Sequence, residues 1–193
     1  MSLMKDRTAV IVVLTVAVLG SLYFFGYSSP TFRMASTSVP SADVSSLVLT
    51  LAQTSASPPT LKVTIKNTHP SSTFTVLEWD TPLDKQALNL GVFQAIDATG
   101  TKIDIPRLMV NRKLPPSREA LVELAPGAEV SKEVGLDKRW VPKDKFTIKA
   151  EGKWKAVWEK AAGDVQASDL EELGGGAAGT GEFKSDEVTV DVA

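Results

Sequence analysis

The chain of 193 residues contains no cysteine and one histidine, His69. Without thiols it has no disulfide framework, no thiolate zinc or iron–sulfur site and no cysteine nucleophile. A single histidine excludes a His-rich metal site and the two-histidine HExxH helix, and any Ser-His-Asp triad would have to use this one side chain. These counts favour a protein without a metal, a cofactor or an enzymatic activity.

Neither sign of charge predominates. There are 21 Lys and Arg residues and 23 Asp and Glu residues, which gives a net charge of −2. This balance argues against a nucleic-acid binder that works by neutralising phosphates. With 43% hydrophobic and 23% charged residues, the composition is that of an ordinary globular protein, and the length favours one domain.

One long run without charge lies near the N-terminus. Lys5 and Arg7 fall within residues 1–7, and the twenty uncharged residues 8–27 follow, ending in an aromatic cluster. Twenty apolar residues are enough to span a bilayer as a helix, and aromatic residues suit a membrane interface. The pattern predicts a transmembrane anchor with residues 1–7 in the cytosol, so that the protein is a single-pass membrane protein with its C-terminal part lumenal or extracellular.

Two other placements stay open. A cleaved signal peptide would give a secreted protein, although such a peptide normally has a shorter apolar core and a small-residue cleavage site. A translation start at Met34 would instead give a cytoplasmic protein. The lack of cysteine and of an Asn-x-Ser/Thr acceptor fits that third placement, because many exported domains carry one or the other.

The remainder of the chain has the pattern of strands. Residues 28–45 are rich in Ser, Thr and Pro and predict a tether. From residue 46 the apolar residues alternate with polar ones, most cleanly at Leu61, Val63 and Ile65. Further strand-like runs, separated by turn residues, occupy 74–79, 92–97, 120–124, 129–136, 146–151 and 188–192. Seven or eight short strands predict an all-β, antiparallel sandwich over residues 46–193.

About thirty residues separate the last two of these runs, far more than a hairpin loop needs. Trp154, Val157 and Trp158 fit either a continued strand or the apolar stripe of a short helix. Residues 161–181 then combine acidic side chains with a glycine-rich run, and we interpret them as a flexible acidic insertion. The alternative is an acidic lid around Asp169, Glu171 and Glu172 that binds a partner or the chain's own basic loop.

Most candidate sites are weak. The glycine-rich run of residues 174–181 lacks the Lys-Ser/Thr of a phosphate loop, so we interpret it as a linker. His69 precedes Pro70 in a predicted turn and is expected to be a loop residue. The acidic residues between Asp97 and Asp104 do not fit calcium-loop spacing and indicate a plain turn.

Two stretches are better candidates for contact with a partner protein. The first is a Pro-rich loop that carries four basic residues, Arg107, Arg112, Lys113 and Arg118, and would suit an acidic partner. The second lies at the end of a strand and contains Trp79, Asp80, Leu83 and Asp84. Asp80 and Asp84 also provide the one carboxylate pair that a hydrolase mechanism would use, which requires both to face one cleft about 5 to 9.5 Å apart.

The order of several short motifs resembles a known family. The sequence is similar to the β-sandwich domain that precedes the catalytic domain in deuterolysin-type zinc peptidases and occurs alone in fungal proteins. The motifs are residues 61–67 (LKVTIKN), 77–84 (LEWDTPLD), Phe93 with 97–100 (DATG), 124–127 (LAPG) and 183–188 (FKSDEV). Nothing in the chain matches the peptidase's HExxH helix. The resemblance therefore implies an immunoglobulin-like accessory module without the enzyme, and more distantly the chain resembles small bacterial proteinase-inhibitor domains.

These observations predict a non-catalytic protein-binding module, displayed from a membrane or secreted, that is associated with a peptidase or another protein. The alternatives are a peptidase inhibitor-like domain and, with less support, a carboxylate-based hydrolase. Nucleic acid is not an expected partner, and the sequence does not identify the protein partner.

The anchor leads to a direct test of placement. The full-length protein should stay with membranes during carbonate extraction, because residues 8–27 carry no charge and are long enough to span the bilayer. Recovery of the full-mass protein in the soluble fraction would contradict the anchor. A soluble product whose N-terminus lies between residues 28 and 45 would favour the cleaved signal.

Overall fold

The computed structural model describes residues 43–137, 139–173 and 179–193. The predicted cytosolic segment 1–7, the anchor 8–27 and the tether up to residue 42 lie outside the described residues. In the part of the chain that is described, no helix has the length and hydropathy to cross a membrane.

The described residues form ten strands, one short α-helix and three 3-10 turns. The strands are β1 (Leu47–Ala56), β2 (Pro59–Asn67), β3 (Phe74–Leu77), β4 (Phe93–Asp97), β5 (Lys102–Ile103), β6 (Leu121–Leu124), β7 (Glu129–Gly135), β8 (Phe146–Trp158), β9 (Gly179–Lys184) and β10 (Val188–Val190). The helical segments are η1 (Val44–Ser46), η2 (Arg118–Ala120), η3 (Ala162–Asp164) and α2 (Ala167–Glu171).

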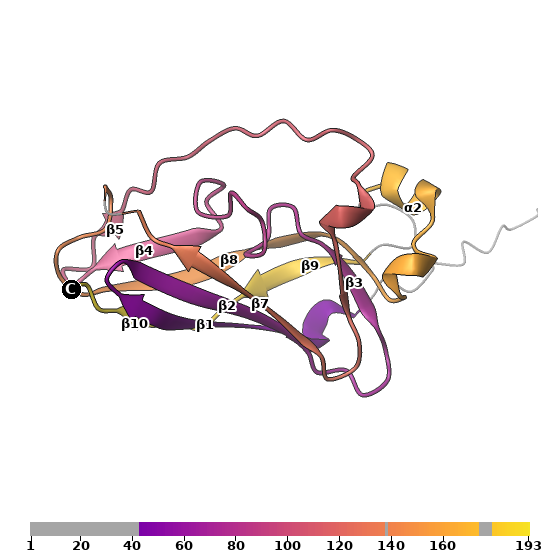
Figure 1. The fold of residues 1–193 in the computed structure, drawn as a ribbon, viewed down its shortest axis with the longest axis horizontal. Helices are drawn as coiled ribbons and strands as arrows, with labels where there is room; N and C mark the ends of the chain where they lie inside the picture. Colours follow the sequence, from indigo (N-terminus) through magenta and orange to yellow (C-terminus); the bar gives the residue numbers. More distant parts are fainter. Residues whose placement is uncertain (1–42, 138, 174–178) are drawn as a thin grey trace, which may run out of the picture. The chain divides into compact units, whose positions relative to one another are not determined.

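The strands make two antiparallel sheets (Figure 1). The first has the order β1-β2-β7, and the second has the order β5-β4-β8-β3-β6 with β9 and β10 also paired to β8. The 13-residue β8 is the spine of the second sheet. Its first half pairs with β4 on one side and β10 on the other, and its second half pairs with β3 and β9.

The main core follows from the period-two pattern. Leu61, Val63 and Ile65 of β2 are fully buried, and the intervening Lys62 and Lys66 are exposed. Ile148 and Ala150 of β8 belong to the same buried cluster. Alternate side chains of a strand point to opposite faces of a sheet, so this pattern places one face of each strand in the core. The prediction of an all-β antiparallel architecture is confirmed, with ten strands instead of seven or eight.

Asn67 joins the two sheets at one corner. Its buried amide nitrogen donates to the carbonyl oxygens of Ser72, Leu124 and Ala125 at 2.8, 2.9 and 3.1 Å. Its amide oxygen accepts the His69 backbone N–H at 2.9 Å. One side chain therefore links the backbone of the turn after β2 to that of the turn between β6 and β7, and it pairs the buried Leu124 carbonyl.

The domain begins earlier than predicted. Residues 43–45 were expected to belong to the tether, but η1 starts at Val44, and the Asp43 carboxylate accepts the Ser45 backbone N–H at 3.0 Å. Val44 packs against the main core. The Ser- and Thr-rich composition of this segment does not predict the turn, because a single apolar side chain, Val44, is enough to hold the turn against the core.

The predicted flexible insertion is wrong for most of its length. β8 continues through Trp154 to Trp158, and η3 and α2 follow within residues 162–171. Val165 and Leu170 from these turns are buried with Leu77, Ala156 and Trp158 in a second core. Residues 161–173 thus cover apolar side chains of β3 and β8, and residues 174–178 lie outside the described residues.

An ion pair supports this covering segment. Lys160 donates to the Asp169 carboxylate, and the Gln166 backbone N–H donates to the same oxygen at 2.8 Å. The Lys160 hydrogen bond, followed by that of Gln166, lowers the pKa of Asp169. A lowered carboxyl pKa means that the contribution to stability is present above the ordinary pKa of Asp and is lost as the pH falls through the lowered value. Asp169 therefore pairs with Lys160 and not with the basic loop.

The second core can be tested by truncating one side chain. Leu170→Ala should lower the free energy of unfolding by about 2 to 4 kcal/mol, because it removes a buried apolar side chain and leaves a cavity. Ile148→Ala in the main core should cost a similar amount. Glu171→Ala is the matched control on the same helix and should change stability by less than about 0.5 kcal/mol in urea denaturation. An equally small effect of Leu170→Ala would show that residues 161–173 are a loop that does not pack on the second core.

Candidate interaction surface

A long segment without regular secondary structure connects β5 to η2. In Figure 1 it arches over the connection between β3 and β4. Residues 106–114 of this segment are called the strap, and residues 78–92 are called the underlying loop. The strap contains three of the four basic residues that the sequence singled out, and Arg118 lies just beyond it in η2.

The strap exposes apolar side chains. Leu108, Met109 and Leu114 are 55%, 103% and 62% exposed, and Val110 is 36% exposed. Among the described residues the remaining large apolar side chain with comparable exposure is Val48 on β1. The backbone groups of residues 109–116 make no hydrogen bond within the described part of the chain. The strap therefore offers both apolar side chains and unpaired main-chain groups to solvent.

The first end of the strap is attached through Asn89. The Leu108 backbone N–H donates to the Asn89 carbonyl at 2.9 Å, and the Asn89 side-chain amide donates to the Pro106 carbonyl at 2.8 Å. Arg107 lies against Gly91, whose φ of +78° favours glycine. A Cβ at Gly91 would stand 2.7 Å from the Arg107 guanidinium carbon, so a larger residue there would displace the end of this flexible side chain.

The second attachment is the buried carboxylate of Asp84, which is 3% exposed. It accepts the backbone N–H groups of Asp80 and Gln86, each at 2.9 Å, and it pairs with the guanidinium of Arg112. The same guanidinium lies over the ring of Trp79, with 5.4 Å between its central carbon and the ring centroid. Aspartate suits this position because its short side chain can accept backbone hydrogen bonds within a turn.

The predicted contact around residues 79–84 is largely buried. Trp79, Leu83 and Asp84 have little exposed surface, and the Leu83 carbonyl accepts a hydrogen bond from Lys132 at 2.6 Å. Asp80 remains partly exposed and pairs with Lys155 at 2.8 Å. These side chains hold the underlying loop in place, and Trp79, Leu83 and Asp84 therefore offer little surface to a partner.

The basic loop is also used differently from the prediction. Arg112 pairs with Asp84, and Arg118 donates to the carbonyls of Ala162 and Val165 at 3.0 and 2.8 Å. Lys113 is exposed. Arg118 is the member of this loop that contacts the covering segment, and it does so through backbone carbonyls instead of acidic side chains.

The carboxylate pair does not have the features of a hydrolase site. Both oxygens of Asp84 accept hydrogen bonds from the protein, and Asp80 forms an ion pair with a lysine of β8. A catalytic acid and its partner must face a space that admits the substrate. Here the Asp84 carboxylate is enclosed in the turn that it organises.

Other predicted candidates are structural. His69 accepts the Ser72 backbone N–H at 2.8 Å and packs edge-on against Phe74. Asp97 accepts the backbone N–H groups of Thr99 and Thr101, both at 2.9 Å, which closes the turn before β5. The side-chain hydrogen bond from Thr99, followed by that from the Thr101 backbone, lowers the pKa of Asp97. The predictions of a loop histidine and a plain turn are confirmed.

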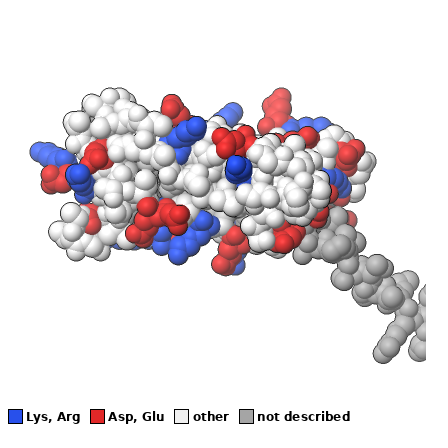
Figure 2. Space-filling view, turned by 90° about the horizontal axis from the view of Figure 1, so that it is seen from below, with Lys and Arg blue, Asp and Glu red and all other residues white. Residues whose placement is uncertain are grey.

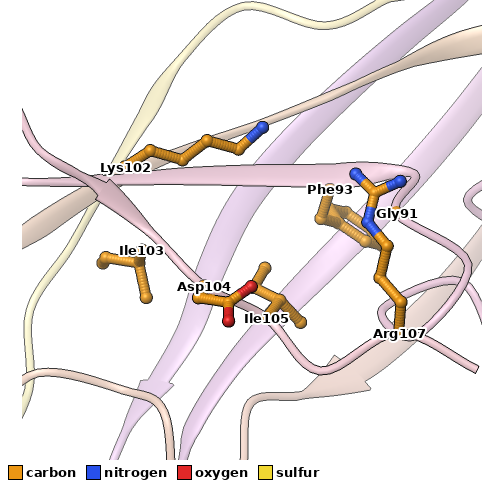
Figure 3. A pocket seen from close by; sticks show the side chains of 7 residues that line it. All are labelled: Gly91, Phe93, Lys102, Ile103, Asp104, Ile105 and Arg107. Atoms are coloured by element: carbon orange, nitrogen blue, oxygen red, sulfur yellow. The ribbon is translucent and has the colours of Figure 1, made fainter.

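A small cavity lies beside the first attachment of the strap (Figure 3). It has a volume of about 100 Å³, which is room for a few water molecules. Lys102, Asp104 and Arg107 line it together with apolar side chains from β4 and β5. Its mixed charge and small size make it a poor site for a drug-sized ligand, which needs roughly 300 Å³ or more.

A second hollow, of about 280 Å³, lies against the strap itself. Leu88, Leu108 and Trp140 line it, with the ion pair of Asp137 and Arg139 at its rim. In the face drawn in Figure 2, acidic and basic groups are interspersed among other residues. Within the described residues no three His, Cys, Asp or Glu side chains come together as a metal site.

The strap stands out in the sequence by its basic residues and not by its apolar ones. The apolar run Leu108-Met109-Val110 and the separate Leu114 were not singled out, although they lie between prolines in a loop that shows no strand period. The role of Asn89 in holding the strap was not predicted either, because a single polar residue in a loop gives no sequence pattern that indicates its partner. Pairing of Asp84 with Arg112, 28 residues away, had no local signal.

Comparison with known proteins gives two results. A family model described as an immunoglobulin-like domain matches residues 46–192. A protein of Arthroderma benhamiae with the name "Uncharacterized secreted protein" is 38% identical over 134 residues, which cover 67% of each chain. The matched range agrees with the domain limits expected from the sequence.

The second attachment predicts unequal effects of two neighbouring basic residues. Arg112→Gln should lower the free energy of unfolding by about 2 to 4 kcal/mol, because it leaves the buried Asp84 carboxylate without its counter-charge. Because the Arg112 side chain is 24% exposed, we expect a loss of stability near the lower end of the range for breaking a buried ion pair. Lys113→Gln is the matched control and should change stability by less than about 0.5 kcal/mol in thermal denaturation. Equal effects would mean that the ion pair does not hold the strap.

Proposed function

The chain belongs to the immunoglobulin-like domain family, and we propose that it is a non-catalytic module that binds another protein through the strap. The observation that carries this proposal is the concentration of exposed apolar side chains on residues 108–114. Isolated exposed apolar residues are normal, but a contiguous group of them on a soluble domain marks a contact surface.

The physical basis of binding is the burial of these side chains. Covering a large apolar side chain contributes about 1.5 to 3 kcal/mol. Leu108 also lines the hollow with Leu88 and Trp140, so a partner that covers the strap has an apolar depression next to it. Aromatic anchors such as Trp140 are frequent at the centre of protein interfaces. That the partner is acidic remains a prediction. The exposed Lys113 would raise the rate of association with such a partner.

For the location we propose secretion. The relative from Arthroderma benhamiae is named as a secreted protein, which supports the alternative in which residues 8–27 act as a cleaved signal. The single-pass anchor rests on residues outside the described part of the chain. Either arrangement places the strap outside the cytosol.

The finer resemblance to the domain of deuterolysin-type peptidases also belongs to the proposal. It is supported by the order of the motifs, among which the Asn at the end of β2 and the Pro-Gly turn before β7 meet through the hydrogen bonds of Asn67. Association with a peptidase is the form of protein binding that this resemblance favours. A peptidase inhibitor-like role is the second candidate, and the extended strap with an unpaired main chain supports it.

The role of the strap can be tested by capture. Immobilised full-length protein should retain a partner from the medium of the cells that make it, and Met109→Asp should reduce that retention by about tenfold or more, because a charge replaces a buried apolar contact. Val48→Asp is the matched control, since Val48 is an exposed apolar residue far from the strap in sequence and on β1. Equal retention by both variants would refute the strap as the contact surface.

A further inference from the structure

β7 forms an open edge of the first sheet. It is the outer strand in the order β1-β2-β7, so a neighbouring strand pairs with one side of it (Figure 1). At the end of this pairing the Leu136 backbone N–H donates to the Pro59 carbonyl at 2.9 Å. Main-chain groups of successive residues in an antiparallel strand point to opposite sides, so even-numbered residues of β7 face β2 and odd-numbered ones face outward. The outward set is Glu129, Ser131, Glu133 and Gly135.

This edge is accessible to a partner. All four residues of the outward set are exposed, and for Gly135, which has no side chain, the exposure is that of the main chain itself. Within the described residues no backbone group outside β2 pairs with the main chain of β7. A row of unpaired N–H and C=O groups on a strand edge is a template for a further strand.

The opposite edge of the same sheet is closed. The Gln53 side chain of β1 donates to the Asp191 carbonyl at 2.6 Å, and its amide oxygen accepts the Asp191 backbone N–H at 2.8 Å. These two bonds imitate strand pairing and join β1 to the residue after β10. Leu47 and Leu49, at the beginning of β1, are buried. A strand added to this sheet would therefore pair with β7.

The lysine in β7 does not block this edge. A lysine on the inner face of an edge strand usually prevents pairing, because a further strand would bury its charge without a partner. Lys132 is half-buried in the same row as Val130 and Val134, but its ammonium donates to the Leu83 carbonyl at 2.6 Å. This hydrogen bond is kept when another strand covers β7, so the charge stays satisfied.

We propose that β7 binds an extended segment of another protein as a fourth strand, with basic side chains at two positions four residues apart on the outer face of that segment. Glu129 and Glu133 lie on the outer face of β7, and within the described residues neither forms an ion pair. Lys66 and Lys62 of β2 lie opposite them on one side. Basic residues on the other side would make the charges alternate across three strands, which is the favourable arrangement for directly opposed residues.

The inner side of the added strand would meet a hollow between β7 and the underlying loop. The hollow has a volume of about 160 Å³, and Ala87, Leu88 and Val134 provide its apolar lining. This is room for a small apolar side chain such as valine and not for an aromatic ring. Strand addition takes its affinity from main-chain hydrogen bonds and its specificity from pockets for alternate side chains, and β7 offers both.

The probe is a fluorescent peptide of sequence VKVTVKV with blocked ends, which places valine on one face and Lys, Thr and Lys on the other. The full chain in non-ionic detergent should bind it with a dissociation constant below about 1 mM in fluorescence anisotropy. The peptide VEVTVEV should bind at least about tenfold more weakly, because it places carboxylates opposite Glu129 and Glu133. Absence of binding at about 1 mM, or equal affinity for the two peptides, overturns the proposal.

Methylation of the peptide nitrogens tests main-chain pairing directly. In a paired strand alternate N–H groups face the neighbouring strand and the others face away. Methylating one alternate set of nitrogens should therefore abolish binding, whereas methylating the other set should change the affinity by less than about threefold. Equal effects of the two sets would mean that the peptide does not add to the sheet.

Ser131→Pro tests the same edge from the side of the protein. Proline is tolerated on an edge strand where the N–H faces solvent, so the variant removes one outward donor and leaves the pairing with β2 in place. It should weaken peptide binding by about tenfold or more, because it also obstructs the approach of a strand. Ser131→Ala is the matched control, which loses the hydroxyl contact with Thr64 but keeps the N–H, and should change the affinity by less than about threefold.

Thermal denaturation shows whether the variants are folded. Unchanged affinity in a folded Ser131→Pro variant overturns the proposal. If that variant does not fold, the double variant Glu129→Gln with Glu133→Gln supplies the test: its affinity for VKVTVKV should fall by about three- to tenfold at low salt, and the difference from the unchanged chain should shrink in high salt. Unchanged affinity of the double variant at low salt contradicts the predicted charge preference.

This inference goes beyond the proposed function, because it uses β7 and not the strap. Met109→Asp should leave peptide binding unchanged, and Ser131→Pro should leave capture by the strap unchanged. Failure of the peptide experiments with normal capture would overturn the β7 site alone. Normal peptide binding with capture that Met109→Asp does not affect would support the β7 site and refute the strap.

Discussion

The buried carboxylate of Asp84 is the interaction on which the arrangement of this surface depends. It accepts two backbone N–H groups of its own turn and the guanidinium of Arg112, so one group fixes the underlying loop and attaches the strap to it. A carboxylate this deeply buried needs such partners, because an unpaired buried charge is far more costly than an exposed one. The turn between β3 and β4 and the path of the strap are therefore determined together, although they are separate in the sequence.

The strands that could be predicted are those with one face in the core. The alternation in β2 and in the first half of β8 requires one buried side and one exposed side, and this pattern is visible in the sequence. β9 begins at Gly179 with a glycine-rich sequence that has no such pattern, so its first three residues were assigned to the flexible insertion. The cover formed by η3 and α2 was missed because Val165 and Leu170, two apolar residues among polar ones, are enough to bury it against Trp158. Composition describes the average of a segment, whereas burial depends on single side chains.

The sequence drew attention to the strap through its basic residues, and the structure gives these residues another role. Four basic residues between prolines suggested a charged contact, but Arg112 and Arg118 are engaged inside the fold. Their partners are a distant aspartate and two backbone carbonyls, and no local pattern marks such pairs. The apolar residues between them carry the exposed surface instead. The charged side chains hold the strap in position, and its apolar side chains are exposed to solvent.

Exposed apolar residues usually favour collapse onto the core or association with other chains. The strap avoids collapse because it is attached at both ends, by Asn89 near Leu108 and by Asp84 at Arg112, with too few residues between them to fold inward. The attachments also reduce the conformational freedom that would be lost on binding, which is the cost that most weakens recognition of flexible peptides. A segment that is exposed, apolar and already ordered can therefore use most of its contact energy for affinity. The two attachments that hold the strap on the domain therefore also lower the entropic cost of binding a partner.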